Sequence, residues 1–503
     1  MHEHDNLSEP DLGELLEQGR LGGIVPDALW TGVCKQLAAG QLDLLGLWGD
    51  TDLVHMAVWA PQLKTVSVIS YACTEGTFPS VARIHTPADR LERTITDLFG
   101  LKPVNPHDTR LWLNHGKWGI NHPLGLPLPS SGVAPYTFLP VEGESLHHIP
   151  VGPVHAGIIE PGFFRFTANG ETVVRLEERL GYVHKGVESL LNGTTPEHGV
   201  KLAGRVSGDS TVAYSIAYAR AVEDALSVKV PPRALWLRAL MAEMERIANH
   251  LGDIGAVCND AAFALMLAHC GILREQVMRT AQLCFGHRFM KDIIVPGGIT
   301  VDVGAQELPA LQALVEAIEA RFPALIDLYD NTASLQDRTV STGILKPELA
   351  ARFAAGGHVG RASGRDFDCR RSPGYAPYDS LTFEVPVRSE GDVNARVWIR
   401  ILEVEQSLSL MKQILARLPE GRINTPLPAI TEAVEGFALA ESFRGDVLVW
   451  LRLGADGRIE RCHLRDPSWF QWPLLEAVIE NNIVADFPLC NKSFNCSYSG
   501  HDL

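Results

Sequence analysis

Two short segments of this chain carry closely spaced hydroxyl side chains, and their chemistry limits the kind of site they can form. The first is Arg205-Val206-Ser207-Gly208-Asp209-Ser210, and the second runs from Phe494 to His501 and contains Ser497 and Gly500. A serine hydroxyl stays protonated at neutral pH, whereas soft transition metals are held by thiolates. The nine cysteines are scattered and no two form a Cys-x-x-Cys pair, so we expect no iron–sulfur cluster in this chain. The two segments are therefore not expected to hold a soft transition metal.

Composition excludes several classes of protein. The chain has 503 residues, of which 46% are hydrophobic and 21% charged, as in globular proteins of two or three domains. Its formal net charge of −16 argues against nucleic-acid binding, because phosphate recognition needs a basic surface. No apolar run reaches the roughly 18 residues of a membrane span, and residues 1–5 are too polar for a secretory signal. Scattered cysteines indicate a cytoplasmic protein, and any membrane attachment is expected through partner subunits.

The N-terminal part predicts a small α/β unit. Strand-like runs cover residues 53–59 and 65–70, and a helix follows in which Thr86 is the expected N-cap and Gly100 the stop. Six prolines between residues 121 and 150 then predict an extended linker. We therefore divide the chain into a first domain at 1–120, a linker at 121–150 and a second domain at 151–503.

The second domain is expected to be mainly helical. Its first residues, Gly152 to Gly162, are rich in turn formers and predict a β-hairpin at the rim. Apolar residues recur at spacings of four and three between Leu237 and Leu251, which indicates one buried face of a long helix. Further helices are expected over 308–329 and 393–418. The predicted fold class is α+β, with a small N-terminal α/β domain before a mainly helical domain with a β-hairpin rim.

Motifs in both parts resemble proteins of one superfamily. Those in the N-terminal part resemble the small hydrophilic subunit of respiratory complex I and lie at Glu92–Gly100, Pro106–Arg110 and Asn121–Leu124. A colinear series in the second part resembles the large subunit of nickel–iron hydrogenases, in the membrane-bound, complex I-related group of the formate hydrogenlyase type. Its blocks are Gly181–Glu188, Glu243–Leu251, Arg361–Gly364, Asp368–Arg370, Gly391–Arg396 and Val484–Leu489. The resemblance implies a hydrogenase large-subunit fold fused to a complex I-like small domain.

The same resemblance implies that the nickel site has been lost. The family holds nickel with four cysteines, in Arg-x-Cys-Gly-x-Cys and Asp-Pro-Cys-x-x-Cys. The corresponding positions of this chain are Ser207, Ser210, Ser497 and Gly500. Three hydroxyls and a residue without a side chain cannot replace four thiolates. These residues argue against a working hydrogenase.

Three other residues acquire a role through the resemblance. In complex I the same pocket receives a quinone headgroup beside a partner's iron–sulfur cluster, and His155 corresponds to the histidine that contacts it. Asp260 corresponds to the aspartate that pairs with this histidine and raises the pKa of the imidazole. Glu188 corresponds to the acid that moves protons in hydrogenases, a role that suits a buried carboxyl group with a raised pKa. The structural alternatives are a turn histidine for His155 and helix-surface acids for the other two.

Two positions depart from the complex I pattern. Pro196 stands where a tyrosine is the second quinone partner, and His198 is the nearest substitute donor. Lys185 replaces an arginine expected near the partner's cluster, which keeps the charge but loses the planar fork of the guanidinium.

Two functions follow from these expectations. The favoured one is a nickel-free, hydrogenase-like subunit of a membrane-bound, complex I-related oxidoreductase that passes electrons to quinone or another acceptor. The alternative is a redox-silent scaffold that joins an iron–sulfur subunit to a proton-translocating membrane arm. Both imply an iron–sulfur small subunit and integral membrane, antiporter-like subunits as partners, at the cytoplasmic face of the cell membrane. The chain itself is expected to bind no cofactor, with quinone as the candidate ligand and the iron–sulfur cluster in a partner.

Overall fold

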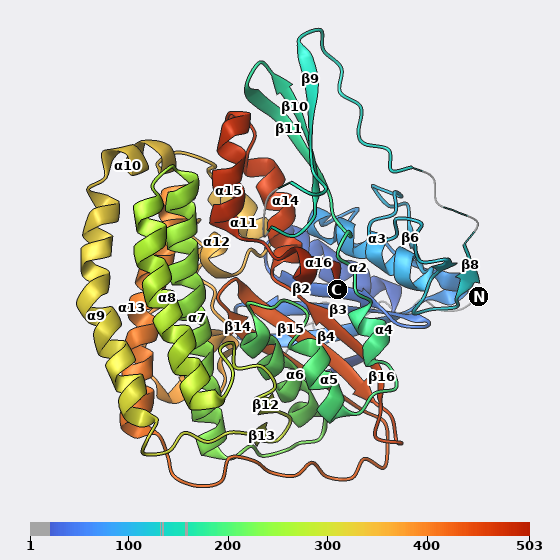
Figure 1. Ribbon diagram of the computed structural model, residues 1–503. Coiled ribbons are helices and arrows are strands. Elements are labelled where there is room, and N and C mark those ends of the chain that lie inside the picture. Colours follow the sequence, from blue (N-terminus) through green and yellow to red (C-terminus); the bar gives the residue numbers. More distant parts are fainter. Residues whose placement is uncertain (1–20, 131, 133–134, 156–158) are drawn as a thin grey trace.

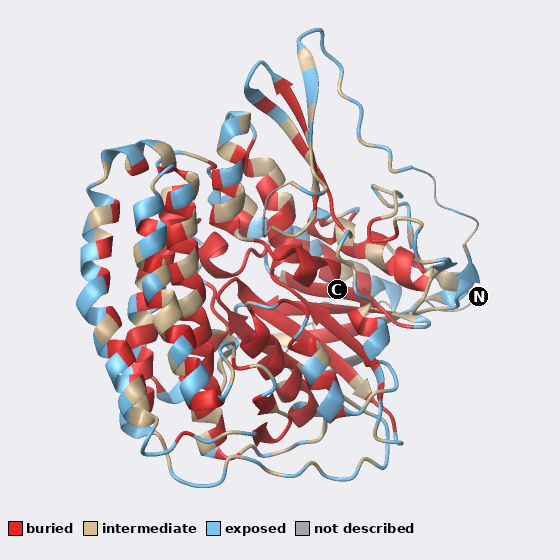
Figure 2. Cartoon of the chain, in the orientation of Figure 1, coloured by how far each residue is buried: buried red, intermediate tan, exposed pale blue. Residues whose placement is uncertain are grey.

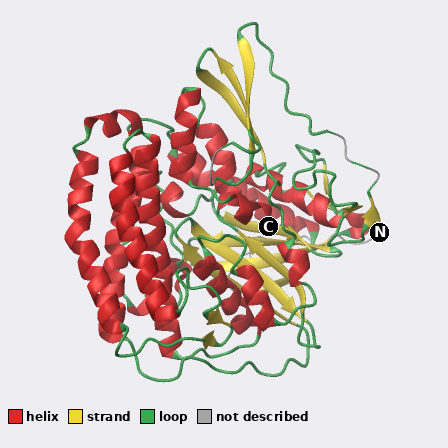
Figure 3. Ribbon diagram, viewed as in Figure 1, coloured by secondary structure: helices red, strands yellow, loops and turns green. Residues whose placement is uncertain are grey.

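An N-terminal β-sheet forms one layer of the molecule (Figures 1 and 3). The computed structural model describes residues 21–130, 132, 135–155 and 159–503. Residues 1–5, which are too polar for a secretory signal, lie outside the described residues. The sheet has the order β1-β4-β3-β2, with β1 parallel to β4 and the other pairs antiparallel. Its elements are β1 (Leu21–Ile24), α2 (Asp27–Ala38), β2 (Asp43–Gly49), β3 (Leu53–Ala60), β4 (Thr65–Ala72) and α3 (Asp89–Phe99). The two strands predicted at 53–59 and 65–70 are confirmed as β3 and β4.

Helix α3 begins later than the sequence suggested. A 3-10 turn covers Thr86–Ala88, the α-helix starts at Asp89, and no side-chain hydrogen bond caps either element. Glu92, an acid of the first turn of α3, does not cap its own helix. Its carboxylate accepts hydrogen bonds from the backbone of Val81 and Ala82, in the segment before the helix. The predicted stop is confirmed, because Gly100 ends the helix in the left-handed conformation at φ 77°.

A second sheet, which the sequence analysis did not anticipate, packs against the first. Its strands β14 (Val434–Ser442), β15 (Gly445–Leu453) and β16 (Ile459–Arg465) are antiparallel in that order. Helix α6 (Thr211–Ala225) contacts β14 and β15. The centre of Figure 2 is coloured as buried. Between the two sheets lies one apolar cluster, which consists of Leu45, Trp48, Ala57, Trp59, Val68, Phe367, Cys369, Leu439, Leu448 and Trp450. Residues assigned to the first and second domains thus share a core.

Long helices form a separate layer on the left of Figure 1. They are α7 (Pro232–Asp260), α8 (Ala264–Phe285), α9 (Leu308–Asp330) and α13 (Val393–Arg417). Helix α7 contacts α8 and α13, and α9 contacts both of these. The helices predicted in this domain are confirmed: 237–251 lies within α7, 308–329 corresponds to α9 and 393–418 to α13. No helix in the described ranges is long and apolar enough to cross a membrane.

A β-arm projects from the top of the molecule in Figure 1. It consists of β9 (Leu146–Val151), β10 (Phe163–Asn169) and β11 (Thr172–Arg179), in the order β11-β10-β9. Val151 lies opposite Phe164, so the predicted hairpin is present and residues 152–162 connect its strands, although 156–158 are outside the described residues. The linker expected at 121–150 is only partly free of secondary structure, because β8 (Leu128–Pro129) and most of β9 fall inside it. The described residues between these two strands form neither helix nor strand.

The remaining elements surround these layers. The C-terminal helices α14 (Ser468–Val478), α15 (Phe487–Phe494) and α16 (Tyr498–Asp502) lie at the base of the arm (Figure 1). The short elements are β5 (Thr77–Pro79), β6 (Lys102–Val104), β7 (Ile120–Asn121), β8 (Leu128–Pro129), α4 (Val187–Leu191), α5 (Pro196–Ala203), β12 (Ile294–Val295), β13 (Gly298–Ile299), α10 (Ala333–Thr339), α11 (Pro347–Arg352) and α12 (Gly357–Arg361).

Candidate functional site

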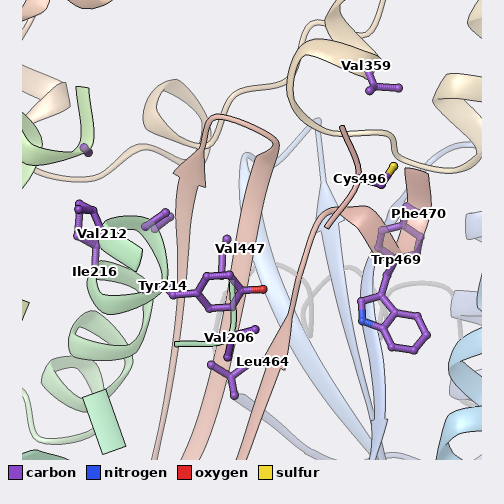
Figure 4. Close-up of a cluster of buried hydrophobic side chains, with 14 of the residues drawn as sticks. Val206, Val212, Tyr214, Ile216, Val359, Val447, Leu464, Trp469, Phe470 and Cys496 are labelled. Atoms are coloured by element: carbon purple, nitrogen blue, oxygen red, sulfur yellow. The ribbon is translucent and has the colours of Figure 1, made fainter. Parts of the chain in front are cut away.

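The two serine segments meet in the folded chain. Ser210 is the N-cap residue of α6, and Ser497 is the N-cap of α16, where its Oγ accepts a hydrogen bond from the backbone of Gly500 at 2.9 Å. The Oγ atoms of Ser207 and Ser497 are 2.8 Å apart, a hydrogen bond between residues 290 positions apart in sequence. Val206 of the first segment and Cys496 of the second belong to one cluster of buried hydrophobic side chains, drawn in Figure 4.

A buried arginine cross-links the two segments. Arg444, in the turn between β14 and β15, donates to both carboxylate oxygens of Asp209 at 2.7 Å and to Ser210 Oγ at 3.2 Å. Its Nε also donates to the carbonyl oxygen of Asn495. Burial alone would raise the pKa of Asp209, but the charge and hydrogen bonds of Arg444, together with the hydrogen bond from Ser207, outweigh it and hold that pKa below its ordinary value. The carboxylate also accepts a hydrogen bond from Ser207 at 2.9 Å.

These residues do not fit a nickel–iron group. Ser207 and Ser497 satisfy each other, and Ser210 receives a hydrogen bond from a guanidinium. A Cβ at position 500 would lie 2.4 Å from Oδ2 of Asp466, so a fourth thiolate cannot be placed there without moving that carboxylate. Within the described ranges, no group of three or more His, Cys, Asp or Glu side chains is arranged to hold a metal ion.

Beside the serine segments lies a cavity of about 520 Å³. Its wall is formed in part by residues between β9 and β10, by the end of α7 and by helices α15 and α16. The backbone of Ser499 in α16 donates a hydrogen bond of 3.0 Å to the carboxylate of Glu160, which lies between β9 and β10. The lining residues are Val151, His155, Ile159, Glu160, Ser207, Gly208, Asp209, Asp260, Arg444, Phe487, Pro488, Asn491, Lys492, Asn495, Cys496, Ser497, Tyr498 and Ser499. Apolar side chains and charged groups thus share one cavity.

His155 lines this cavity with one ring nitrogen unpaired. Its Nδ1 lies 3.2 Å from the carbonyl oxygen of Pro153. Because a carbonyl oxygen only accepts hydrogen bonds, Nδ1 carries the hydrogen. The other nitrogen, Nε2, is buried and has no hydrogen-bond partner among the described residues. In the neutral ring Nε2 is therefore a free acceptor, and in the imidazolium it is a free donor.

Asp260, the last residue of α7, lines the same cavity but does not pair with His155. The described residues include no hydrogen bond or ion pair between these two side chains, so the expected carboxylate–imidazole pair is not formed in this structure. The charged group that acts on Asp260 is Lys492. Burial raises the pKa of Asp260, and the opposing effect of the lysine is smaller.

Glu188 lies elsewhere, and its environment contradicts the expected raised pKa. It lines a separate, smaller cavity, where its carboxylate is 2.9 Å from Arg461 Nη2 and 2.7 Å from His463 Nδ1. Burial would raise the pKa of Glu188, but these neighbours outweigh it and lower the pKa to about 2. At neutral pH this carboxylate holds a charge and no exchangeable proton. Its surroundings indicate an ion pair that joins α4 to β16.

The structure also shows the surroundings of Pro196, His198 and Lys185, the positions at which the chain departs from the complex I pattern. Pro196 is the first residue of α5, and His198 is exposed on that helix; neither lines the cavity. Lys185 donates from Nζ to the carbonyl oxygens of Arg205 and Val206 at 3.2 and 2.7 Å, so it holds the first serine segment. Sequence reasoning missed Tyr498 and Arg444. Only Tyr498 had a sequence signal, its place inside the second serine segment.

Family models match successive parts of the chain. The 49 Kd subunit of respiratory-chain NADH dehydrogenase matches residues 260–433, nickel-dependent hydrogenase matches 185–252, and the 30 Kd subunit of the same NADH dehydrogenase matches 49–132.

Individual relatives cover more of the chain. Formate hydrogenlyase subunit 5 of Escherichia coli is 31% identical over 438 residues, which is 84% of this chain and 77% of the relative. An NADH-quinone oxidoreductase subunit of Dehalococcoides mccartyi is 31% identical over 67% of this chain and 92% of its own length. A chain of the archaeal membrane-bound sulfane sulfur reductase matches with a TM-score of 0.68 at 25% identity, over 73% of this chain and all of that chain. The protein thus belongs to the family that unites the 49 Kd subunit of complex I with the large subunit of nickel–iron hydrogenases, and it carries a 30 Kd-like part before it.

Proposed function

We propose that this chain is a nickel-free large subunit of a membrane-bound oxidoreductase and that its 520 Å³ cavity receives a quinone as electron acceptor. The membership of a membrane-bound complex is supported by the relatives, which include the alpha subunit of a membrane-bound hydrogenase and a subunit of NADH-quinone oxidoreductase. The observation that carries the quinone proposal is the unpaired, buried Nε2 of His155 in that cavity.

The cavity residues suit a ring with a carbonyl oxygen. Part of the cavity wall is apolar and is formed by Val151, Ile159 and Phe487. These side chains exclude water from a bound ring. The imidazolium of His155 donates a hydrogen bond from Nε2 to the oxygen and can pass on its proton, while the Nδ1–H bond to Pro153 holds the ring in place. Quinone reduction takes two electrons and two protons, and the proposal assigns the electrons to an iron–sulfur cluster of a partner subunit.

The proposed partners are an iron–sulfur small subunit and integral membrane, antiporter-like subunits, with this chain at the cytoplasmic face of the membrane. One observation favours the alternative of a redox-silent scaffold. The former ligand positions are closed by internal hydrogen bonds and the Asp209–Arg444 ion pair, so this part of the chain is complete without a cofactor.

The test uses the purified native complex with all its subunits, reduced viologen as donor and a water-soluble benzoquinone as acceptor. We expect His155→Ala to lower quinone reduction about 100-fold, since general acid catalysis contributes at least that much, while subunit composition stays unchanged. The matched control is His198→Ala, which removes an exposed histidine outside the cavity. Unchanged turnover in His155→Ala, or a wild-type complex that does not reduce quinone, would refute the quinone role and support the scaffold. Stoichiometric nickel in the native complex would contradict the nickel-free assignment.

A further inference from the structure

We infer that the hydroxyl of Tyr498 donates a second hydrogen bond to the acceptor, beside His155. This inference rests on the proposed function of the cavity and adds a binding residue to it. Tyr498 is the first residue of α16, directly after the former ligand position Ser497. Both Tyr498 and His155 line the cavity, and their ring centroids are 6.4 Å apart.

The hydroxyl of Tyr498 has a hydrogen to donate. Its oxygen accepts a hydrogen bond from Asn491 Nδ2 at 3.3 Å, which orients the group and occupies one lone pair. No described residue accepts a hydrogen bond from this hydroxyl. Burial raises the pKa of Tyr498, so the group stays protonated at neutral pH and above. A ligand oxygen in the cavity can take the hydrogen bond that the protein leaves unmade.

The position of the ring relative to the arm loop is fixed by close packing. A Cβ at Gly162 would lie 2.6 Å from Cε1 of Tyr498, so only glycine lets the loop approach this closely. The ring also packs on Trp472, with centroids 4.7 Å apart and planes at 66°, and on Phe164. Gly162 also donates from its backbone to the carbonyl oxygen of Pro153 at 2.9 Å, the same oxygen that accepts from His155 Nδ1, so these contacts bring the ring of Tyr498 close to the turn that holds His155.

The two groups are chemically complementary. Tyr498 is a permanent donor, whereas Nε2 of His155 accepts in the neutral ring and donates in the imidazolium. This pair suits a carbonyl oxygen that becomes a hydroxyl on reduction, as in a quinone headgroup. Tyr498 thereby supplies, from the C-terminal segment, the hydroxyl that Pro196 cannot provide from α5.

The experiment compares Tyr498→Phe with Tyr182→Phe in the native complex. Tyr182 packs against His115 and does not line the cavity, so its substitution controls for loss of a tyrosine hydroxyl elsewhere. We expect Tyr498→Phe to raise KM for the water-soluble benzoquinone roughly three- to tenfold, the effect of one lost hydrogen bond. The rate with ferricyanide, an acceptor without a carbonyl group, should stay at the wild-type value. Tyr182→Phe should change neither of these.

The outcomes separate this inference from the function on which it rests. If His155→Ala weakens quinone reduction and Tyr498→Phe leaves KM unchanged, the role of Tyr498 is refuted and the quinone site stands. If Tyr498→Phe lowers the rates with quinone and ferricyanide alike, its effect is structural and the inference fails. If the wild-type complex does not reduce quinone, the proposed function fails first and this inference fails with it.

Discussion

Replacing Glu188 by glutamine tests whether this residue is an ion-pair partner or a proton carrier. A pKa of about 2, against an ordinary value of 4.5, corresponds to about 3 kcal/mol of stabilisation at neutral pH. The side chain is only 5% exposed, so solvent screens this interaction little. Because the folded-state pKa is lowered, the stabilisation is complete above pH 4.5 and is lost as the pH falls from 4.5 towards 2.

The assay is urea unfolding of the full chain at a series of pH values. We expect Glu188→Gln to lower the free energy of unfolding by about 3 kcal/mol at pH 7, with the difference from wild type shrinking below pH 4.5. The control, Glu460→Gln, removes a half-exposed acid of the same sheet that pairs with Arg452. An exposed ion pair of this kind contributes less than about 1 kcal/mol.

Two results would refute this reasoning. A difference between wild type and Glu188→Gln that stays constant down to pH 3 would show that the carboxylate is not the source of the stabilisation. An infrared band of a protonated carboxyl group at pH 7, absent from Glu188→Gln, would show that the residue does hold a proton there. The second result would restore the role of proton carrier.

Two further substitutions probe the contacts around the two serine segments. Arg444→Met should lower the free energy of unfolding by about 1–3 kcal/mol, because it leaves the carboxylate of Asp209, 35% exposed, without its cation; a thermal midpoint equal to that of wild type would contradict this, and Arg444→Lys should restore part of the loss. Gly500→Ala should cost about 1–3 kcal/mol in urea unfolding, because its Cβ meets Asp466, whereas Gly208→Ala, which meets nothing within 4 Å, is the matched control. Equal stability of these two glycine variants would show that position 500 can accept a side chain.

Helix α7 was predictable although it is buried on nearly every side. Charged residues such as Arg238, Glu243 and Arg246 lie between its apolar positions, which therefore still recur visibly at spacings of four and three. The strands β14 to β16 were missed, and β15 shows why. Gly445–Leu453 is buried at every position except Arg452, so it shows no alternation of apolar and polar residues.

The site was predictable only where a local motif marks it. The meeting of Ser207 with Ser497 followed from the family's two ligand motifs, and the structure brings them together. The pKa of Glu188 could not be predicted, because Arg461 and His463 reach it from a strand more than 270 residues later in the sequence. Charge partners of this kind depend on the tertiary fold, which leaves no trace in local spacing.

The shared core of the two sheets has a consequence for synthesis of the protein on the ribosome. The N-terminal sheet is complete at Ala72, but the strand β16, whose His463 stacks on Trp48, ends at Arg465, about 390 residues later. At the usual elongation rates that interval lasts roughly 20–80 s. Trp48 lacks this neighbour throughout that time. A nascent chain of this protein therefore presents an aromatic surface that a chaperone can bind until β16 has been synthesised.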